Sequence, residues 1–152
     1  MYSIKTKKLT KKFKDKVAVN AIDLLIKEGE LFSLLGVNGA GKTTTIKMLS
    51  GLILPTSGEI LIDNMDVKEE IFKIKQILNV SPQETAIAPN LSVKENLEFM
   101  AGVYQIKNKE EKINELVKMF KLEEVLNQKA KTLSGGWQRK VSIAISLINE
   151  PK

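Results

Sequence analysis

The chain has 152 residues, which is enough for one modest domain with a single buried core. It contains neither cysteine nor histidine, which excludes disulfide bonds, thiolate metal sites and any histidine base within these residues. The net charge is +6, but the lysines are scattered in the manner of a solvated surface, so we expect no nucleic-acid partner. No apolar run approaches the roughly 18 residues that suggest a membrane span.

The first third of the chain has the pattern of strands followed by one helix. Residues 3–9 and 17–26 predict two strands, with a turn at 14–16 between them. Residues 31–35 form a short apolar run between glycines, which predicts a buried strand. A glycine-rich loop follows, and helical spacing then predicts a helix over 43–50 that stops at Gly51.

The middle of the chain returns briefly to strands and then becomes helical. We expect a turn at 54–58, a strand over 59–63, a short helix over 68–75 and a second short strand over 77–80. Ser92 and Glu95 have the spacing of a capping box, and an apolar stripe to Tyr104 predicts a helix after them. Further helices are predicted after Asn108, over 122–126, and from Gly136 until shortly before Pro151.

The glycine-rich loop matches the phosphate-loop pattern G-x-x-x-x-G-K-[ST] at Gly36, Gly41, Lys42 and Thr43. Glycines let the backbone aim amides at phosphate oxygens, and the following helix adds the positive end of its dipole. Lys42 is expected to reach the β- and γ-phosphates, and the Thr43 hydroxyl to ligate Mg²⁺. The residues expected to bind the nucleotide here are Gly36, Asn38, Gly39, Ala40, Gly41, Lys42, Thr43 and Thr44.

A second motif distinguishes among phosphate-loop proteins. Leu133-Ser134-Gly135-Gly136-Trp137-Gln138-Arg139 resembles the L-S-G-G-x-Q signature of the ATP-binding cassette (ABC) family. Ser134 offers a hydroxyl, and Gly135 and Gly136 allow close backbone approach at a helix start. The resemblance implies an α/β P-loop NTPase fold of the ABC type: an N-terminal β subdomain with the phosphate-loop strand and helix, plus an α-helical subdomain.

Two more residues fit that family. Gln83 corresponds to the Q-loop glutamine, which in the family contacts Mg²⁺ or the attacking water and senses the transporter. Phe13, which lies 23 residues before Gly36, corresponds to the aromatic residue that stacks on adenine; a Phe in the core is the simpler alternative. Val37 and Trp137 depart from the residues commonest at those motif positions. The resemblance therefore implies ATP and Mg²⁺ as ligands, with Thr43 and Gln83 on the metal.

The family's organisation implies three segments and several partners. Residues 1–83 would form the nucleotide-binding core, 84–134 the helical subdomain, and 135–152 the signature helix leading back to the core. Two copies would meet head to tail, so that Ser134, Gly135 and Gly136 complete the partner's site. A transmembrane permease subunit would hold the pair at the cytoplasmic face of the cell membrane. The residues around the phosphate loop most resemble exporters of the drug- or sodium-extruding type.

No residue of the chain corresponds to the family's catalytic carboxylate. In the family, an apolar strand carrying the Mg²⁺-binding Asp and the catalytic Glu follows the position of Lys152. We therefore expect a fragment that lacks the C-terminal part of the core sheet. Made alone, it is expected to bind nucleotide poorly, to hydrolyse it negligibly and to self-associate through unpaired strand edges.

Two other functions fit the motifs. One is a soluble ABC ATPase of translation or DNA maintenance, although only 51 positions and no sustained heptads separate Gln83 from Ser134, which favours a transporter. The other is a non-catalytic nucleotide-binding module.

Overall fold

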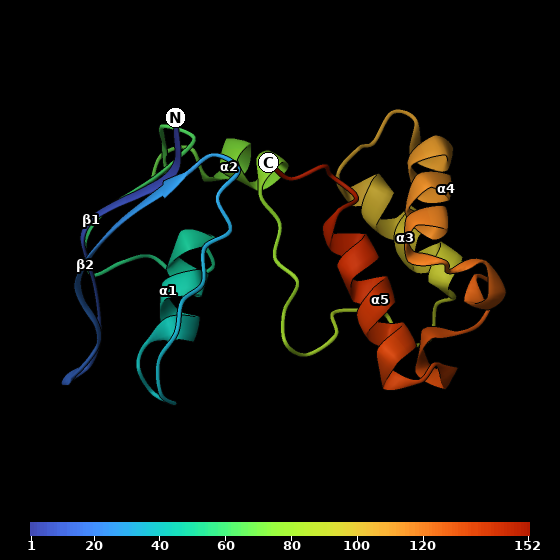
Figure 1. Ribbon diagram of the computed structural model, residues 1–152, viewed down its shortest axis with the longest axis horizontal. Coiled ribbons are helices and arrows are strands. Elements are labelled where there is room, and N and C mark those ends of the chain that lie inside the picture. Colours follow the sequence, from blue (N-terminus) through green and yellow to red (C-terminus); the bar gives the residue numbers. More distant parts are fainter. The chain divides into compact units, whose positions relative to one another are not determined.

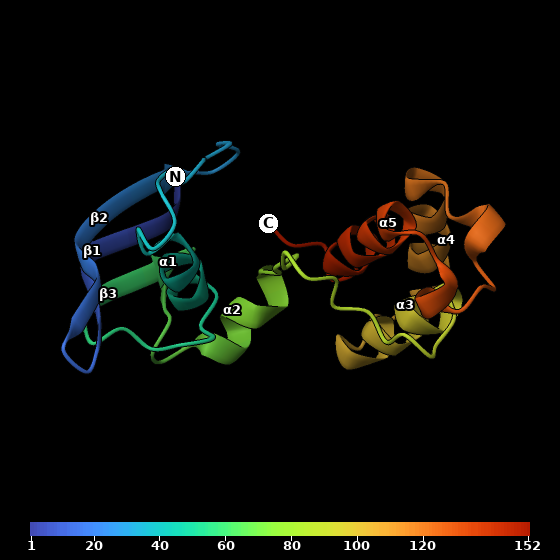
Figure 2. The ribbon, with the colours of Figure 1, turned by 90° about the horizontal axis from the view of Figure 1, so that it is seen from below.

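A long antiparallel hairpin begins the chain. In the computed structural model, which describes residues 1–152, β1 (Tyr2–Phe13) and β2 (Lys16–Lys27) are joined by a tight turn at Lys14 and Asp15. Two further strands, β3 (Ser57–Ile62) and β4 (Met65–Asp66), complete a sheet of order β2-β1-β3-β4. All its neighbouring strands are antiparallel. Figure 2 shows β2, β1 and β3 side by side. The strands predicted over 3–9, 17–26 and 59–63 are confirmed.

Strand β4 was not predicted, although its turn carries a sequence signal. Asp63 and Asn64 both have positive φ, 51° and 64°, which is the backbone of a two-residue I′ hairpin turn. Asp and Asn tolerate this conformation better than most residues. The turn pairs Ile62 with Met65 and adds a short edge to the sheet.

Helix α1 (Lys42–Leu49) lies against one face of the sheet (Figures 1 and 2). Gly51, with φ 66°, ends it as predicted. The buried apolar side chains of this unit come from the sheet, the helix and the segment after β4; they are Leu9, Val19, Ile26, Met48, Leu49, Ile60, Ile62, Val67 and Ile74.

The prediction of a buried strand over 31–35 is wrong. The segment has no strand pairing, and Leu31 and Leu35 are 95% and 89% exposed. A strand exists only when its backbone groups pair with another strand, and no segment within residues 1–152 pairs with this one. Its apolar composition alone therefore did not decide its structure.

The short strand predicted over 77–80 is also absent. Helix α2 (Ile71–Ile77) ends where that strand was expected to begin. The amide of Val80 then donates to the side-chain oxygen of Asn79 at 2.8 Å, and the Asn79 amide donates to Asn149 at 2.8 Å. Side-chain bonds of this kind take the place of a strand ladder.

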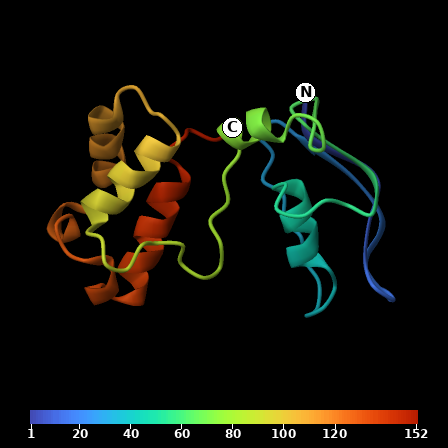
Figure 3. The same ribbon diagram turned by 180° about the vertical axis from the view of Figure 1, so that it is seen from behind.

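The chain forms two compact units, Met1–Lys75 and Gln76–Lys152. The second consists of helices α3 (Val93–Val103), α4 (Lys109–Phe120) and α5 (Gly135–Ser146), with two short 3₁₀ turns, Glu123–Val125 and Ala130–Thr132. Figure 3 shows these three helices packed together. Their shared core is apolar and includes Val93, Leu97, Ala101, Ile113, Leu116, Val117, Leu122, Val141, Ala144, Ile145 and Ile148. None of the helices has the length and apolar content needed to span a bilayer.

The predicted capping box at the start of α3 is confirmed. The Ser92 hydroxyl accepts from the amide of Glu95 at 3.2 Å, and the Glu95 carboxylate accepts from the amide of Ser92 at 2.7 Å. The backbone and side-chain hydrogen bonds with Ser92 lower the pKa of Glu95. Asn108, by contrast, precedes α4 without a side-chain cap bond.

Replacing Ser92 by alanine should lower the free energy of unfolding by about 1 kcal/mol, because one amide at the start of α3 loses its partner. Asn108→Ala should change the free energy of unfolding by no more than a few tenths of a kcal/mol, since the Asn108 side chain makes no cap bond. Urea unfolding of both variants tests the difference. Equal losses in the two variants would contradict the capping assignment.

Candidate functional site

The phosphate loop leads directly into α1, and the conformation of the loop requires two of its glycines. Gly41 has a left-handed backbone with φ 87°, and a Cβ built on it would lie 2.2 Å from the carbonyl oxygen of Ala18 in β2. Gly39 is also left-handed, with φ 85°, but a Cβ there would meet no atom within 4 Å. Glycine is therefore needed at 39 for conformation and at 41 for both conformation and space.

The Lys42 side chain folds back over this loop. Its ammonium donates to the carbonyl oxygen of Gly36 at 2.6 Å and to that of Val37 at 2.9 Å. The amide of Ala40 donates to the same Val37 carbonyl at 3.2 Å. The loop thus holds one positive charge beside the N-terminus of α1, where the helix dipole adds to it. Residues 36–40 are exposed, so an anion can reach this charge.

Three consecutive threonines open α1, and they differ in their surroundings. Thr45 is buried, and its hydroxyl donates to the carbonyl oxygen of Gly41 at 3.0 Å. Thr44 is half-buried, whereas Thr43 is exposed. Thr43 is therefore the threonine whose hydroxyl is most accessible to a ligand at the phosphate loop.

Phe13 ends β1 at the tip of the hairpin, and its side chain is 48% exposed. The Lys11 ammonium lies 5.2 Å from the centre of its ring. Phe13 is thus not a core residue of this unit, and about half of its side chain is open to solvent.

The signature-like segment forms the start of α5. Ser134 is the N-cap residue, and its hydroxyl accepts from the amide of Trp137 at 3.4 Å. Gly135 and Gly136 are exposed, have ordinary negative φ, and have no other atom closer than 4.0 Å to a Cβ built on them. The fold of the chain therefore requires glycine at neither position. Trp137 packs partly against the helical core, with the Lys140 ammonium 4.3 Å from its ring centre.

Gln83 is exposed and lies in the second unit, in a segment without regular secondary structure. The segment is tethered on both sides of Gln83. Before it, the Arg139 guanidinium of α5 donates to the carbonyl oxygen of Pro82. After it, the buried Asn96 of α3 accepts from the Ala88 amide at 2.7 Å and donates to the Ala88 carbonyl at 3.1 Å.

The candidate residues therefore fall into two groups. The phosphate loop and Phe13 belong to the first unit, whereas Gln83 and the signature-like segment belong to the second. Within the second unit, Arg139 connects the signature helix to the residue before Gln83. Sequence reasoning did not find Arg139 or Asn96, although Arg139 follows the signature directly.

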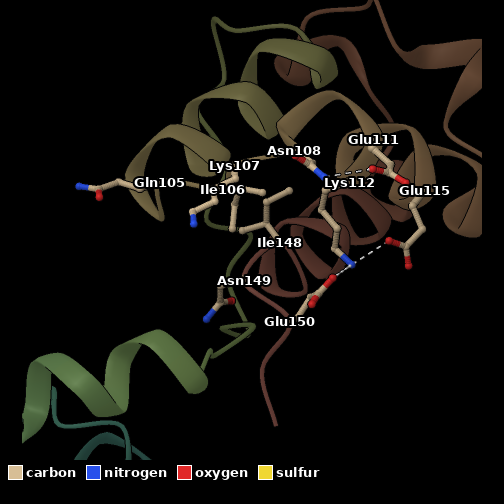
Figure 4. A pocket seen from close by; sticks show the side chains of 10 residues that line it. All are labelled: Gln105, Ile106, Lys107, Asn108, Glu111, Lys112, Glu115, Ile148, Asn149 and Glu150. Atoms are coloured by element: carbon tan, nitrogen blue, oxygen red, sulfur yellow. Dashed lines mark hydrogen bonds and ion pairs between the residues drawn. The ribbon is translucent and has the colours of Figure 1, made fainter.

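A cavity of about 450 Å³ also lies in the second unit, beside the start of α4 (Figure 4). Figure 4 shows Lys112 between Glu115 and Glu150, and its ammonium lies 2.9 Å from each carboxylate. Burial alone would lower the pKa of Lys112, but the hydrogen bonds to Glu115 and Glu150 outweigh burial and raise it. The charge of Lys112 is thus neutralised within the chain.

Lys112→Met should lower the free energy of unfolding by about 0.5 to 1 kcal/mol, a modest amount because both carboxylates are more than half exposed. Since the pKa of Lys112 is raised on folding, this stabilisation is present below its usual pKa of 10.5 and is lost as pH rises through the folded-state value. Denaturant unfolding at pH 8 and well above pH 10.5 measures this. Lys118→Met, at an exposed position of α4, is the control. A loss that persists unchanged at the higher pH would contradict the ion-pair explanation.

Comparison with known proteins decides the family. The profile described as ABC transporter matches residues 19–152, a span that includes the phosphate loop, Gln83 and the signature-like segment. The chain belongs to the ABC transporter family. Among its relatives, the probable multidrug ABC transporter ATP-binding protein YbhF of Escherichia coli is 41% identical over 150 residues, which are 97% of this chain and 26% of YbhF.

The family assignment extends to the fold. The linearmycin resistance ATP-binding protein LnrL of Bacillus subtilis is 36% identical over 151 residues, which are 98% of this chain and 49% of LnrL. The solved ATP-binding cassette MJ0796, a dimer in a post-hydrolysis state with ADP and Pi, matches with a TM-score of 0.84 and 33% identity over 97% of this chain and 70% of that one. This chain thus has the α/β P-loop fold of an ABC cassette, and it spans between about a quarter and a half of the two curated relatives.

Proposed function

We propose that this chain is the ATP-binding part of an ABC transporter ATPase, which couples ATP binding and hydrolysis to transport across a membrane. The observation that carries the proposal is the phosphate loop, in which Lys42 holds its ammonium over an exposed, glycine-dependent backbone at a helix start. A triphosphate provides the negative charge that such a loop binds. The names of YbhF and LnrL, which refer to multidrug transport and linearmycin resistance, favour an exporter.

The two glycines of the signature-like segment support a composite site. Their exposure and the free space around them mean that glycine at 135 and 136 serves something other than this chain's own packing. An exposed helix N-terminus, capped only by the Ser134 hydroxyl, suits close approach by a phosphate group. We assign this face to the nucleotide bound by a second cassette, in a head-to-tail homodimer.

The oxygen donors at the site suit Mg²⁺. No cluster of three or more acidic, histidine or cysteine side chains that could hold a metal ion exists in the chain. Magnesium keeps several waters and commonly binds through substrate phosphates, so the neutral oxygens of Thr43 and Gln83 fit it. The ion would neutralise phosphate charge. Lys42 and the loop amides bind and orient the phosphates, Phe13 stacks on the base, and none of these residues acts as the base that activates water.

Residues Phe99–Tyr104, at the C-terminal end of α3, and the segment around Gln83 form the proposed docking region for a transmembrane permease subunit. Phe99 and Val103 lie four positions apart on α3 and are 61% and 56% exposed. Asn96, one turn before Phe99, bonds to the segment that follows Gln83. The buried Asn96 side chain can therefore transmit a movement of the Gln83 segment to α3. Docking there would hold the protein at the cytoplasmic face of the membrane.

Nucleotide binding and turnover by the full-length protein test the proposed activity. We expect ATP to bind with Mg²⁺ and to be hydrolysed, with turnover increased by the permease subunit. Absence of both binding and hydrolysis in the assembled transporter would refute the proposal.

The docking region has a separate test. Phe99→Ser should weaken co-purification with the permease subunit, whereas Met119→Ser should not, because Met119 is similarly exposed but lies on α4. Charge reversal at exposed positions of α3 should also weaken co-purification with the permease subunit. Intact assembly in the α3 variants would count against this surface.

A further inference from the structure

We infer that Arg139 is a positioning residue for Gln83. This inference rests on the proposed function, which gives Gln83 its place near Mg²⁺ or the attacking water. The Arg139 guanidinium donates to the carbonyl oxygen of Pro82, and both residues belong to the second unit. The contact joins positions 57 apart in the chain.

The geometry of the peptide bond transmits this contact to Gln83. The carbonyl of Pro82 and the amide of Gln83 belong to one planar unit, so a bond that holds the carbonyl also fixes the direction of the amide. The ring of Pro82 restricts its own φ, which removes another degree of freedom just before the site. The backbone therefore enters Gln83 in a defined direction.

Nothing else in the structure competes for the guanidinium. Arg139 is half-buried, and none of the ion pairs of the chain involves it. A half-buried cation whose hydrogen-bond partner is one backbone carbonyl depends on that carbonyl, because leaving the charge unpaired there is unfavourable. Arg139 lies on α5, the helix that Ser134 caps. The same helix therefore carries the signature-like segment and holds the backbone just before Gln83.

The neighbouring Ser81 supplies a matched control. Its hydroxyl is buried and has no hydrogen-bond partner, so Ser81→Ala alters the same segment without removing a bond. Arg139→Met, in contrast, removes the contact with Pro82 and keeps much of the side chain's length. Arg139→Lys retains a donor and the charge.

The test measures ATP turnover and ATP affinity in the full-length protein. We expect Arg139→Met to lower kcat about tenfold while the Kd for ATP stays within about twofold, because the phosphate loop is untouched. Arg139→Lys should recover part of the loss, and Ser81→Ala should behave as wild type. In the Gln83→Ala background, Arg139→Met should add nothing further, since it acts through Gln83.

Other results would overturn the inference. Additive losses in the double variant, an unchanged kcat in Arg139→Met, or a parallel loss of ATP affinity would each do so. If the wild-type protein neither binds nor hydrolyses ATP, the proposed function fails, and amide hydrogen exchange then tests Arg139 alone. Exchange at residues 83–87 should accelerate in Arg139→Met but not in Ser81→Ala, and unchanged exchange would reject the positioning role.

Discussion

Replacing Lys42 by alanine should reduce ATP turnover by the full-length protein by about a hundredfold or more. The Lys42 ammonium is the charge that the phosphate loop holds through the carbonyl oxygens of Gly36 and Val37. Its removal leaves the loop amides without the cation that balances the β- and γ-phosphates. Steady-state phosphate release, measured at saturating ATP, reports the effect.

The control for this prediction is Lys47→Ala, which removes an exposed lysine from the last turn of the same helix. It should leave turnover within about twofold of wild type, because its charge lies beyond the first helical turn, where the dipole and the loop act on the ligand. Turnover that survives in Lys42→Ala would refute the assigned role of the loop. Equal losses in both lysine variants would show a general charge effect instead.

Gly41→Ala should be the most destabilising single substitution in the loop. We expect it to lower the free energy of unfolding by about 3 kcal/mol. The left-handed backbone at Gly41 is strained for alanine, and the new Cβ would overlap the Ala18 carbonyl, 2.2 Å away. Either β2 or the start of α1 must move, so nucleotide binding should be lost as well. Thermal unfolding and nucleotide titration measure the two effects separately.

Gly39→Ala separates the conformational cost of Gly41→Ala from its steric cost. Gly39 has nearly the same φ as Gly41, yet the space around its Cβ is open. The variant should therefore carry only the conformational cost, about 1 kcal/mol. If the two variants were equally stable, close packing of the loop against β2 would not contribute.

Features that depend on neighbouring residues were predictable from the sequence. The Ser92–Glu95 capping box spans one helical turn, and the hairpin turn at Lys14 and Asp15 follows from polar residues between two strand patterns. The phosphate-loop pattern was recognisable for the same reason, because Gly36 to Thr43 are contiguous in the sequence. Such local rules need no knowledge of the rest of the fold.

Features that depend on distant partners were not predictable in this way. Residues 31–35 have the composition of a buried strand, but a strand requires a second strand to pair with, and composition does not identify one. The bond from Arg139 to Pro82 and the bonds of Asn96 to Ala88 arise only when the helical unit folds. The phosphate loop and the signature-like segment likewise lie in separate units, 1–75 and 76–152, so no local pattern of residues relates one motif to the other.

In the proposed composite ATP site, the phosphate loop of one copy faces the signature-like segment of another. Gly135→Glu suits a test of it, because residue 135 is exposed and open and the substitution should leave the fold unchanged while opposing a phosphate. Lys42→Ala and Gly135→Glu should each abolish turnover in homodimers. A heterodimer purified from the two variants would then contain one doubly altered site and one intact site.

The decisive measurement is therefore the ATP turnover of that heterodimer. The composite site predicts recovery of about half the wild-type rate, because one of two sites is complete. A heterodimer as inactive as its parents, with both subunits folded and assembled, would contradict the head-to-tail arrangement and assign both motifs to a site within one chain.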